Sequence, residues 1–217
     1  MFLDTANVKE IEAMQAFHWL TGVTTNPTLL AKEKGKSRAD ISQEILSILH
    51  DEQRLFVQAT GETQEALYDD AQTILSLDTR IALKIPADEI GFRVITQLKQ
   101  ERPDIEILAT AIFSVEQSYL AALAGCEWVA PYVNRMANQG LDAKQVVAST
   151  AKLFTQLEVP TKILGASFKN TAQVTDTLLA GATDVTIPSD LVQAIMHNKL
   201  AADSIRVFNQ DAKGVKH

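Results

Sequence analysis

The chain has 217 residues, of which 46% are hydrophobic and 22% charged, ordinary values for a globular protein. Its net charge of −7 argues against a nucleic-acid-binding protein, which usually carries a basic face, but is compatible with a local site for a small anion. The single cysteine, Cys126, excludes an intrachain disulfide and favours a reducing compartment. No signal-peptide pattern and no membrane-length apolar stretch is present, so we expect a cytoplasmic protein without membrane or nucleic-acid partners.

Eight short apolar runs recur along the chain, each followed by a helical pattern. They begin at Met1, Thr21, Arg54, Arg80, Ile105, Glu127, Thr161 and Asp184. Most of these starts are 20 to 33 residues apart, about the length of one strand–helix unit. Eight units predict an α/β fold, a single (β/α)8 TIM barrel over residues 1–217. An open doubly wound sheet is the alternative, but it normally has a glycine-rich first turn, which "LDTANV" lacks.

Local signals support the helical assignments between these runs. Three segments begin with a capping-box pattern, at Asn7/Glu10, Ser114/Gln117 and Asn170/Gln173, and Gly125 and Gly181 stand where helices should end. A last helical segment at about 201–211 follows the eighth unit. The eight strand–helix units do not include this segment, so it could pack on a neighbouring subunit.

One charged residue lies inside an apolar run, Lys84 in "IALKIPAD". An arbitrary lysine at a strand end usually reaches solvent or pairs with an acid. Here the run is apolar on both sides, and burial disfavours the ammonium form of a lysine. A neutral amine can attack a carbonyl and form a Schiff base. Lys84 is therefore a candidate nucleophile, with a plain ion pair to Asp4 as the alternative.

Strand alternation predicts which polar side chains meet inside the barrel. Barrel strands point alternate side chains inward, and active sites lie at the strands' C-terminal ends. If bulky aliphatic residues face the helices and no strand is bulged, the inward polar set is Asp4, Thr24, Asn26, Gln58, Lys84, Thr110, Tyr132 and Ser167. On the seventh strand this places Ile163, Gly165 and Ser167 inward and Leu164 outward. Small inward residues (Ala82, Ala130 and Gly165) would leave room for a ligand.

Five of the inward residues have a structural and a functional interpretation. Asp4 pairs with Lys84 or moves protons near an imine. Thr24 and Asn26 end a strand and cap a helix, or bind substrate hydroxyls. Gln58 and Thr110 are satisfied polar groups or hold a catalytic water.

The sequence also contains a candidate anion site and several weak signals. Arg135 is a surface arginine or forms a phosphate clamp with Ser167, which precedes a helix N-terminus after the seventh strand. We expect no metal, because no histidine lies at a strand end, and we also expect no cofactor. Cys126 lies at a helix end and is interpreted as a small buried residue. "GKS" at residues 35–37 lacks the earlier glycine of a P-loop.

As a set, "LDTAN", "GVTTNPT", "LKIPA", "APYVNR" and "GASFK" resemble the signatures of the small transaldolases and fructose-6-phosphate aldolases, over nearly the whole chain. The resemblance implies a (β/α)8 barrel with the Schiff-base lysine at Lys84 and the conserved aspartate at Asp4. It also implies a homo-oligomer, a pentamer or a decamer, whose C-terminal helix reaches a neighbour.

Two positions distinguish the branches of this family. Gln58 and Tyr132 are similar to the aldolase branch, whereas transaldolases carry glutamate and phenylalanine there. "QATG" and "AIFS" depart from the aldolase pattern and leave donor preference open. The resemblance implies a class I aldolase of fructose 6-phosphate that uses Lys84, Asp4, Tyr132, Gln58 and Thr110 in catalysis, with a sugar phosphate and a dihydroxyacetone-type donor as small-molecule partners. A transaldolase is the alternative, and a non-covalent sugar-phosphate isomerase or binding barrel is a third hypothesis.

Overall fold

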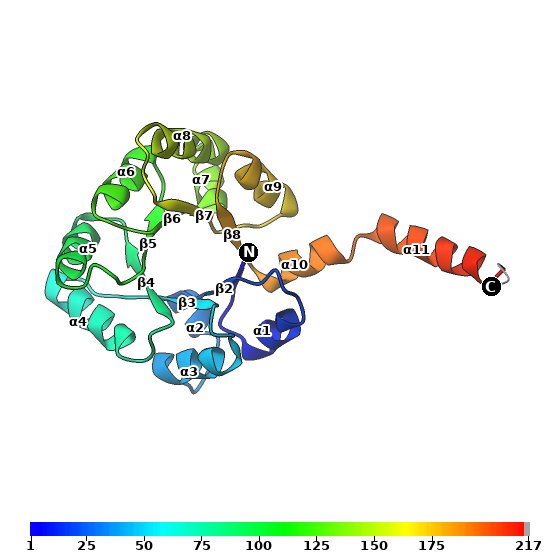
Figure 1. The fold of residues 1–217 in the computed structure, drawn as a ribbon, viewed down its shortest axis with the longest axis horizontal. Coiled ribbons are helices and arrows are strands. Elements are labelled where there is room, and N and C mark those ends of the chain that lie inside the picture. Colours follow the sequence, from blue (N-terminus) through cyan, green and yellow to red (C-terminus); the bar gives the residue numbers. More distant parts are fainter. Residues whose placement is uncertain (215–217) are drawn as a thin grey trace.

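The structure, a computed structural model, describes residues 1–214, in which eight parallel strands form a closed barrel surrounded by helices (Figure 1). The strands are β1 (Phe2–Asp4), β2 (Gly22–Thr24), β3 (Arg54–Gln58), β4 (Ile81–Pro86), β5 (Ile107–Ile112), β6 (Trp128–Pro131), β7 (Lys162–Gly165) and β8 (Asp184–Ile187). The helices are α1 (Val8–Gln15), α2 (Pro27–Leu30), α3 (Arg38–Ile48), α4 (Gln64–Leu75), α5 (Glu89–Glu101), α6 (Val115–Leu123), α7 (Val133–Asn138), α8 (Ala143–Gln156), α9 (Thr171–Leu179), α10 (Ser189–Met196) and α11 (Lys199–Ala212).

Each strand pairs with the next one in the chain, and β1 pairs with β8, where Phe2 lies opposite Thr186. This closure confirms the predicted TIM barrel and excludes the open sheet. All eight apolar runs of the sequence contain a strand. Because the strands are parallel, all of their C-terminal ends lie at one mouth of the barrel, and the polar residues that follow them meet there.

The core has two compartments. The larger one lies between the barrel and its helices, and the smaller one fills the barrel itself. Inside the barrel, the rings of Phe2, Phe56 and Trp128 pack edge to face, with centroids 5.4 to 6.4 Å apart. Trp128 begins its strand, so these aromatic rings close the N-terminal half of the barrel. The open space therefore lies toward the C-terminal mouth.

The inward alternation is as predicted on the first six strands but is wrong on β7. Leu164 and Ala166 lie inside the barrel, and Ile163 belongs to the outer core. A Cβ at Gly165 would meet Thr177 of α9 at 2.5 Å, so this glycine allows close helix packing and does not make room for a ligand. The prediction failed because Ile163 and Leu164 are both bulky aliphatic residues, and hydrophobicity alone does not distinguish them.

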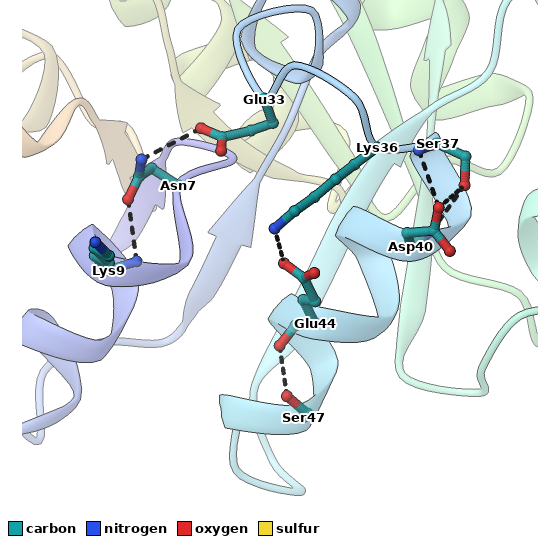
Figure 2. A network of polar contacts seen from close by, with 8 residues as sticks. All are labelled: Asn7, Lys9, Glu33, Lys36, Ser37, Asp40, Glu44 and Ser47. Atoms are coloured by element: carbon teal, nitrogen blue, oxygen red, sulfur yellow. Dashed lines mark hydrogen bonds and ion pairs between the residues drawn. The ribbon is translucent and has the colours of Figure 1, made fainter.

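The predicted caps form, but their reciprocal bonds differ from capping boxes. Asn7, Ser114 and Asn170 cap α1, α6 and α9 as expected. However, the residues three positions later bond elsewhere: Glu10 to the Thr5 hydroxyl, and Gln117 and Gln173 to the N–H groups of Phe113 and Lys169. A complete capping box forms instead at Ser37 and Asp40, at the start of α3 (Figure 2). The cap side chains thus set the helix starts, while the second polar group bonds to a residue one or two positions before the cap.

The helix ends and the C-terminal segment are also as predicted. Gly125 and Gly181 have φ of 91° and 102° and follow the caps of α6 and α9. The segment expected at about 201–211 is helix α11, which projects away from the barrel (Figure 1). Within residues 1–214, no helix combines the length and the apolar character that a membrane span requires.

Candidate active site

A cavity of about 610 Å³ lies at the C-terminal mouth of the barrel, within the usual size range of small-molecule sites. Its lining includes seven residues from the predicted set: Asp4, Asn26, Gln58, Lys84, Tyr132, Arg135 and Ser167. Thr24 and Thr110 do not line it, but each bonds to a residue that does. The structure therefore brings all nine predicted site residues to one place.

Lys84 is buried in this cavity, with 4% of its surface exposed. Its Nζ donates a hydrogen bond of 2.9 Å to the backbone oxygen of Thr25. The side chains of Ile81, Leu83 and Ile85 pack into the outer core and hold the strand, so Lys84 points into the barrel. A single neutral acceptor positions the amine and leaves it able to react with a ligand in the cavity.

Asp4 is held by a chain of hydroxyl groups. Thr24 Oγ1 donates to Asp4 Oδ1 at 2.8 Å, and Thr186 Oγ1 lies 2.6 Å from Thr24 Oγ1. A hydroxyl has one proton, so when Thr24 donates to Asp4, Thr186 must donate to Thr24. Burial raises the pKa of the Asp4 carboxyl above its ordinary value, and this effect exceeds the opposing effects of the Lys84 charge, the Thr24 hydrogen bond and the Lys32 charge. A carboxyl whose pKa is raised keeps its proton to a higher pH than an ordinary aspartate, which suits it to proton exchange.

Tyr132 and Thr110 form the second polar pair of the site. The Tyr132 hydroxyl lies 2.8 Å from Thr110 Oγ1, and either atom can donate. Gln58 pairs in register with Lys84 on the adjacent strand and lines the same cavity. Strand β5 is irregular directly after Thr110: its register with β6 shifts, and Ala111 adopts a φ of 58°. This bulge ends the inward alternation at Thr110 and turns Ala111 toward the cavity.

The cationic side of the cavity carries Arg135 from α7 and Ser167 and Lys169 after β7. The Arg135 guanidinium lies over the Tyr132 ring, 5.0 Å from its centroid, which links the cationic side to the polar pair. Ser167 has a φ of 63°, in the left-handed region. This backbone turn brings Ser167 to the cavity, although the alternation on β7 is opposite to the predicted one.

Asn26 can both cap a helix and bind a ligand, the two roles considered for it from the sequence. Its side-chain oxygen caps α2 by accepting from the N–H of Leu29 at 3.0 Å. The same residue lines the cavity, where the amide N–H₂ group remains as a hydrogen-bond donor. The cap fixes the orientation of the side chain that a ligand would meet.

Other candidates in the sequence do not form sites. Cys126 is buried, and burial raises its pKa to about 12, as expected of a structural thiol. Within residues 1–214 the His, Cys, Asp and Glu side chains form no group able to hold a metal ion. A hollow of about 830 Å³ lies on the outer surface, mainly along α5, and contains none of the predicted site residues.

Sequence reasoning missed Thr186, Lys169 and Lys32. Thr186 lies between Val185 and Ile187, so the same alternation argument would have placed it inward on β8. Lys169 follows Ser167 by two residues, and nothing in that spacing indicates the cavity. Lys32 lies in the loop after α2, and only the fold brings it to the site.

The fold and the cavity together define a TIM-barrel protein with a buried lysine at the C-terminal mouth. A family model described as Transaldolase/Fructose-6-phosphate aldolase matches residues 1–217. The chain belongs to this family, whose members are Schiff-base aldolases or transaldolases. The comparison does not separate the two branches.

Solved structures of flavocytochrome b2 are similar in fold. One with sulfite bound has a TM-score of 0.61 at 14% identity, covering 87% of this chain and 56% of that chain. A mutant with benzoylformate has a TM-score of 0.61 at 13% identity, covering 85% and 53%. A further mutant has a TM-score of 0.60 at 15% identity, covering 87% and 56%. The chain spans about half the length of these proteins, and identities this low show the shared barrel alone.

Proposed function

We propose that this protein is a class I aldolase that cleaves fructose 6-phosphate to dihydroxyacetone and glyceraldehyde 3-phosphate and catalyses the reverse addition. The observation that carries the proposal is the buried Lys84 amine at the base of the mouth cavity, beside Asp4 and opposite a cationic wall. The family match supports the Schiff-base chemistry. The choice of substrate and of branch is the part that we infer.

The reaction begins at the ketose carbonyl. The Lys84 amine attacks C2 after losing its proton, and water leaves as the protonated imine forms. Loss of the proton from the C4 hydroxyl breaks the C3–C4 bond, because the iminium accepts its electron pair and becomes an enamine. Glyceraldehyde 3-phosphate leaves at this point. Protonation of the enamine at C3 and hydrolysis of the imine then release dihydroxyacetone and restore the amine.

Two polar groups are suited to these proton transfers. We assign the proton transfer to Tyr132, through a water held by Gln58, Thr110 and the Tyr132 hydroxyl, because the last two lie within hydrogen-bond distance of each other. Asp4 assists at the imine or at the C4 hydroxyl. Its raised pKa and its fixed hydroxyl partner both favour exchange of a proton.

Substrate binding divides between the two sides of the cavity. Asn26 would bind a hydroxyl group of the dihydroxyacetone half. The predicted substrate contact of Thr24 is replaced by an indirect role, because Thr24 is fully buried outside the cavity lining and its hydroxyl holds Asp4. Arg135 and Ser167 would bind the phosphate, and Lys169 adds a second charge on the same side. Arg135 presents a planar set of donors that matches a phosphate group, and the Tyr132 ring supports its orientation.

Gln58 and Tyr132 favour the aldolase over the transaldolase, which passes the dihydroxyacetone unit to an aldose phosphate. Incubation with fructose 6-phosphate alone separates the two activities. Free dihydroxyacetone without an added acceptor is the expected product. If none forms and the unit is instead transferred to erythrose 4-phosphate, the protein is the transaldolase.

Borohydride reduction in the presence of fructose 6-phosphate tests the covalent step. Peptide mapping should place the reduced adduct on Lys84, and Lys84→Ala should lose both adduct and activity. Lys162→Ala is the matched control, because Lys162 is exposed at the opposite end of the barrel. An adduct on Lys32 or Lys169 instead, or full activity in Lys84→Ala, would overturn the assignment.

We also propose that the protein is a homo-oligomer, a pentamer or a decamer, and works in the cytoplasm. Helix α11 supports the assembly. It carries Leu200, Ile205 and Phe208 with 78%, 56% and 67% of their surfaces exposed. Ile205 and Phe208 lie three positions apart and therefore on one face. A projecting helix with a large apolar face is typical of a subunit contact.

A further inference from the structure

A second cavity adjoins the active-site cavity. It has a volume of about 540 Å³ and is lined by polar residues that include Thr5, Asn7, Glu10 and Asp190. The two cavities share the lining residues Asp4, Leu29, Lys32, Phe168, Lys169 and Pro188. Two of the shared residues are lysines, so cationic side chains border both spaces at their junction.

Lys32 reaches this junction from the side of the barrel opposite Arg135. It follows β2 and α2, whereas Arg135 follows β6. In the closed order β1 to β8, β2 and β6 are four strands apart, which is the largest separation that an eight-stranded barrel allows. Ser167 and Lys169 follow β7, next to β6. Lys32 therefore brings a positive charge from the β2 side to the junction that Lys169 reaches from the β7 side.

The loop that carries Lys32 is fixed at both ends. Asn7 Nδ2 donates to Glu33 Oε1 at 3.3 Å, while the oxygen of the same carboxamide caps α1 (Figure 2). At the other end, the Ser37–Asp40 capping box starts α3. These contacts hold the backbone on both sides of Lys32 in place. A side chain on an ordered loop loses less entropy when it binds a ligand.

The charge of Lys32 is available for a ligand. Within residues 1–214 it forms no ion pair, whereas Lys36 of the same loop pairs with Glu44 at 2.6 Å (Figure 2). The neighbouring Glu33 carboxylate is engaged by Asn7. The Lys32 charge also acts on the site, since it is among the groups that oppose the rise in the pKa of Asp4.

We propose that Lys32 is a specificity-determining residue that binds the terminal phosphate of the substrate from the wall opposite Arg135. It thereby raises the preference for phosphorylated over unphosphorylated substrates. A lysine suits this position because its ammonium is a point charge on a long flexible stem and donates in three directions. The inference rests on the proposed function for the identity of the substrate, but the anion site itself does not depend on Schiff-base chemistry.

The test compares Lys32→Met with the wild-type enzyme in borohydride trapping. Fructose 6-phosphate carries the phosphate and dihydroxyacetone does not, and both should form the imine with Lys84. We expect the half-saturating concentration of fructose 6-phosphate to rise about five- to tenfold, as for loss of one partly solvated charged contact. The value for dihydroxyacetone should not change. Lys32→Arg should restore most of the affinity.

Lys34→Met is the matched control. Lys34 is an exposed lysine of the same loop that lines neither cavity, so its replacement changes the net charge equally without touching the junction. It should leave both half-saturating concentrations at their wild-type values. An equal rise for both ligands in Lys32→Met would show that Lys32 acts through Asp4 or the fold and would overturn the proposal. No rise for fructose 6-phosphate would also overturn it.

Calorimetric titration with inorganic phosphate provides a second test that needs no covalent chemistry. The wild-type protein should bind phosphate more tightly than Lys32→Met, again by about five- to tenfold. Equal binding by the two proteins would refute the role of Lys32. If the wild-type protein formed no adduct at Lys84 but showed this difference, the proposed aldolase function would fail while the anion site stood.

Discussion

Replacing Tyr132 with phenylalanine separates the chemistry of the site from its packing. The change removes one oxygen atom and keeps the ring. The ring contacts Phe113 with centroids 5.8 Å apart and supports the Arg135 guanidinium at 5.0 Å, and phenylalanine preserves both contacts. What is lost is the hydroxyl that lies 2.8 Å from Thr110 Oγ1.

Two separate effects of Tyr132→Phe follow from this geometry. Thr110 is completely buried, so its hydroxyl loses a partner without gaining water, at a cost of about 1–3 kcal/mol. For a chain of this length, each kcal/mol lowers Tm by about 2–4 °C. If Tyr132 moves the proton, kcat falls by about 10²- to 10⁴-fold. The imine still forms, because Lys84 and its Thr25 contact are unchanged.

The double variant Thr110→Val with Tyr132→Phe distinguishes these effects. Replacing both partners by apolar groups of similar shape is nearly neutral for stability, so most of the lost Tm should return. The activity should not return. The assays are fructose 6-phosphate cleavage, thermal unfolding and mass spectrometry of the reduced Lys84 adduct. A Tyr132→Phe enzyme with kcat within a fewfold of wild type, or a double variant that regains activity, would refute the assigned role.

Three further predictions concern a charge, a close contact and an assembly surface. Burial raises the pKa of Asp4 in the folded protein above that in the unfolded chain. The contribution of Asp4 to the free energy of unfolding is therefore fully present below about pH 4, where the carboxyl is protonated in both states, and is lost as the pH rises through the folded pKa. Asp4→Asn cannot ionise, so it should be less active but more stable than wild type at pH 7 in urea unfolding. The difference in unfolding free energy between the two proteins should shrink toward pH 4, and a difference that grows on acidification contradicts this. Gly91→Ala should cost about 1–3 kcal/mol in the same unfolding assay, because its Cβ would clash with the Pro86 backbone oxygen at the end of the Lys84 strand. Wild-type stability would disprove the clash. Phe208→Ser on α11 should lower the assembly mass in light scattering without lowering the helix content, and an unchanged mass would remove α11 from the proposed interface.

Much of the barrel could be predicted from the sequence because its signals are local. The eight strand–helix units and the caps at Asn7, Ser114 and Asn170 depend on patterns within a few residues. The inward direction of Lys84 follows from alternation along one extended strand, with Ile81, Leu83 and Ile85 on the opposite face. These inferences hold wherever the backbone keeps its regular period.

Alternation stops being informative where the backbone leaves that period. Ala111 and Ser167 have positive φ, and both line the cavity for that reason. The sequence contains no glycine at either position to mark the turn, and the prediction for β7 failed just before one of them. The prediction that Ser167 lies at the site was correct, but its reason was wrong. It assumed that Ser167 shares the inward face of β7 with Ile163 and Gly165, and the strand has the opposite alternation.

The sequence by itself determined the repeating units, the buried lysine and the polar residues at the ends of the first seven strands, because these depend on composition and spacing along one segment. Only the tertiary structure decided which of these groups touch. Closure of the barrel joins Thr186 to Thr24 and Asp4, which are far apart in the chain, and brings Lys32 to the side opposite Arg135. Such contacts depend on where eight strands meet, and no local pattern encodes that meeting.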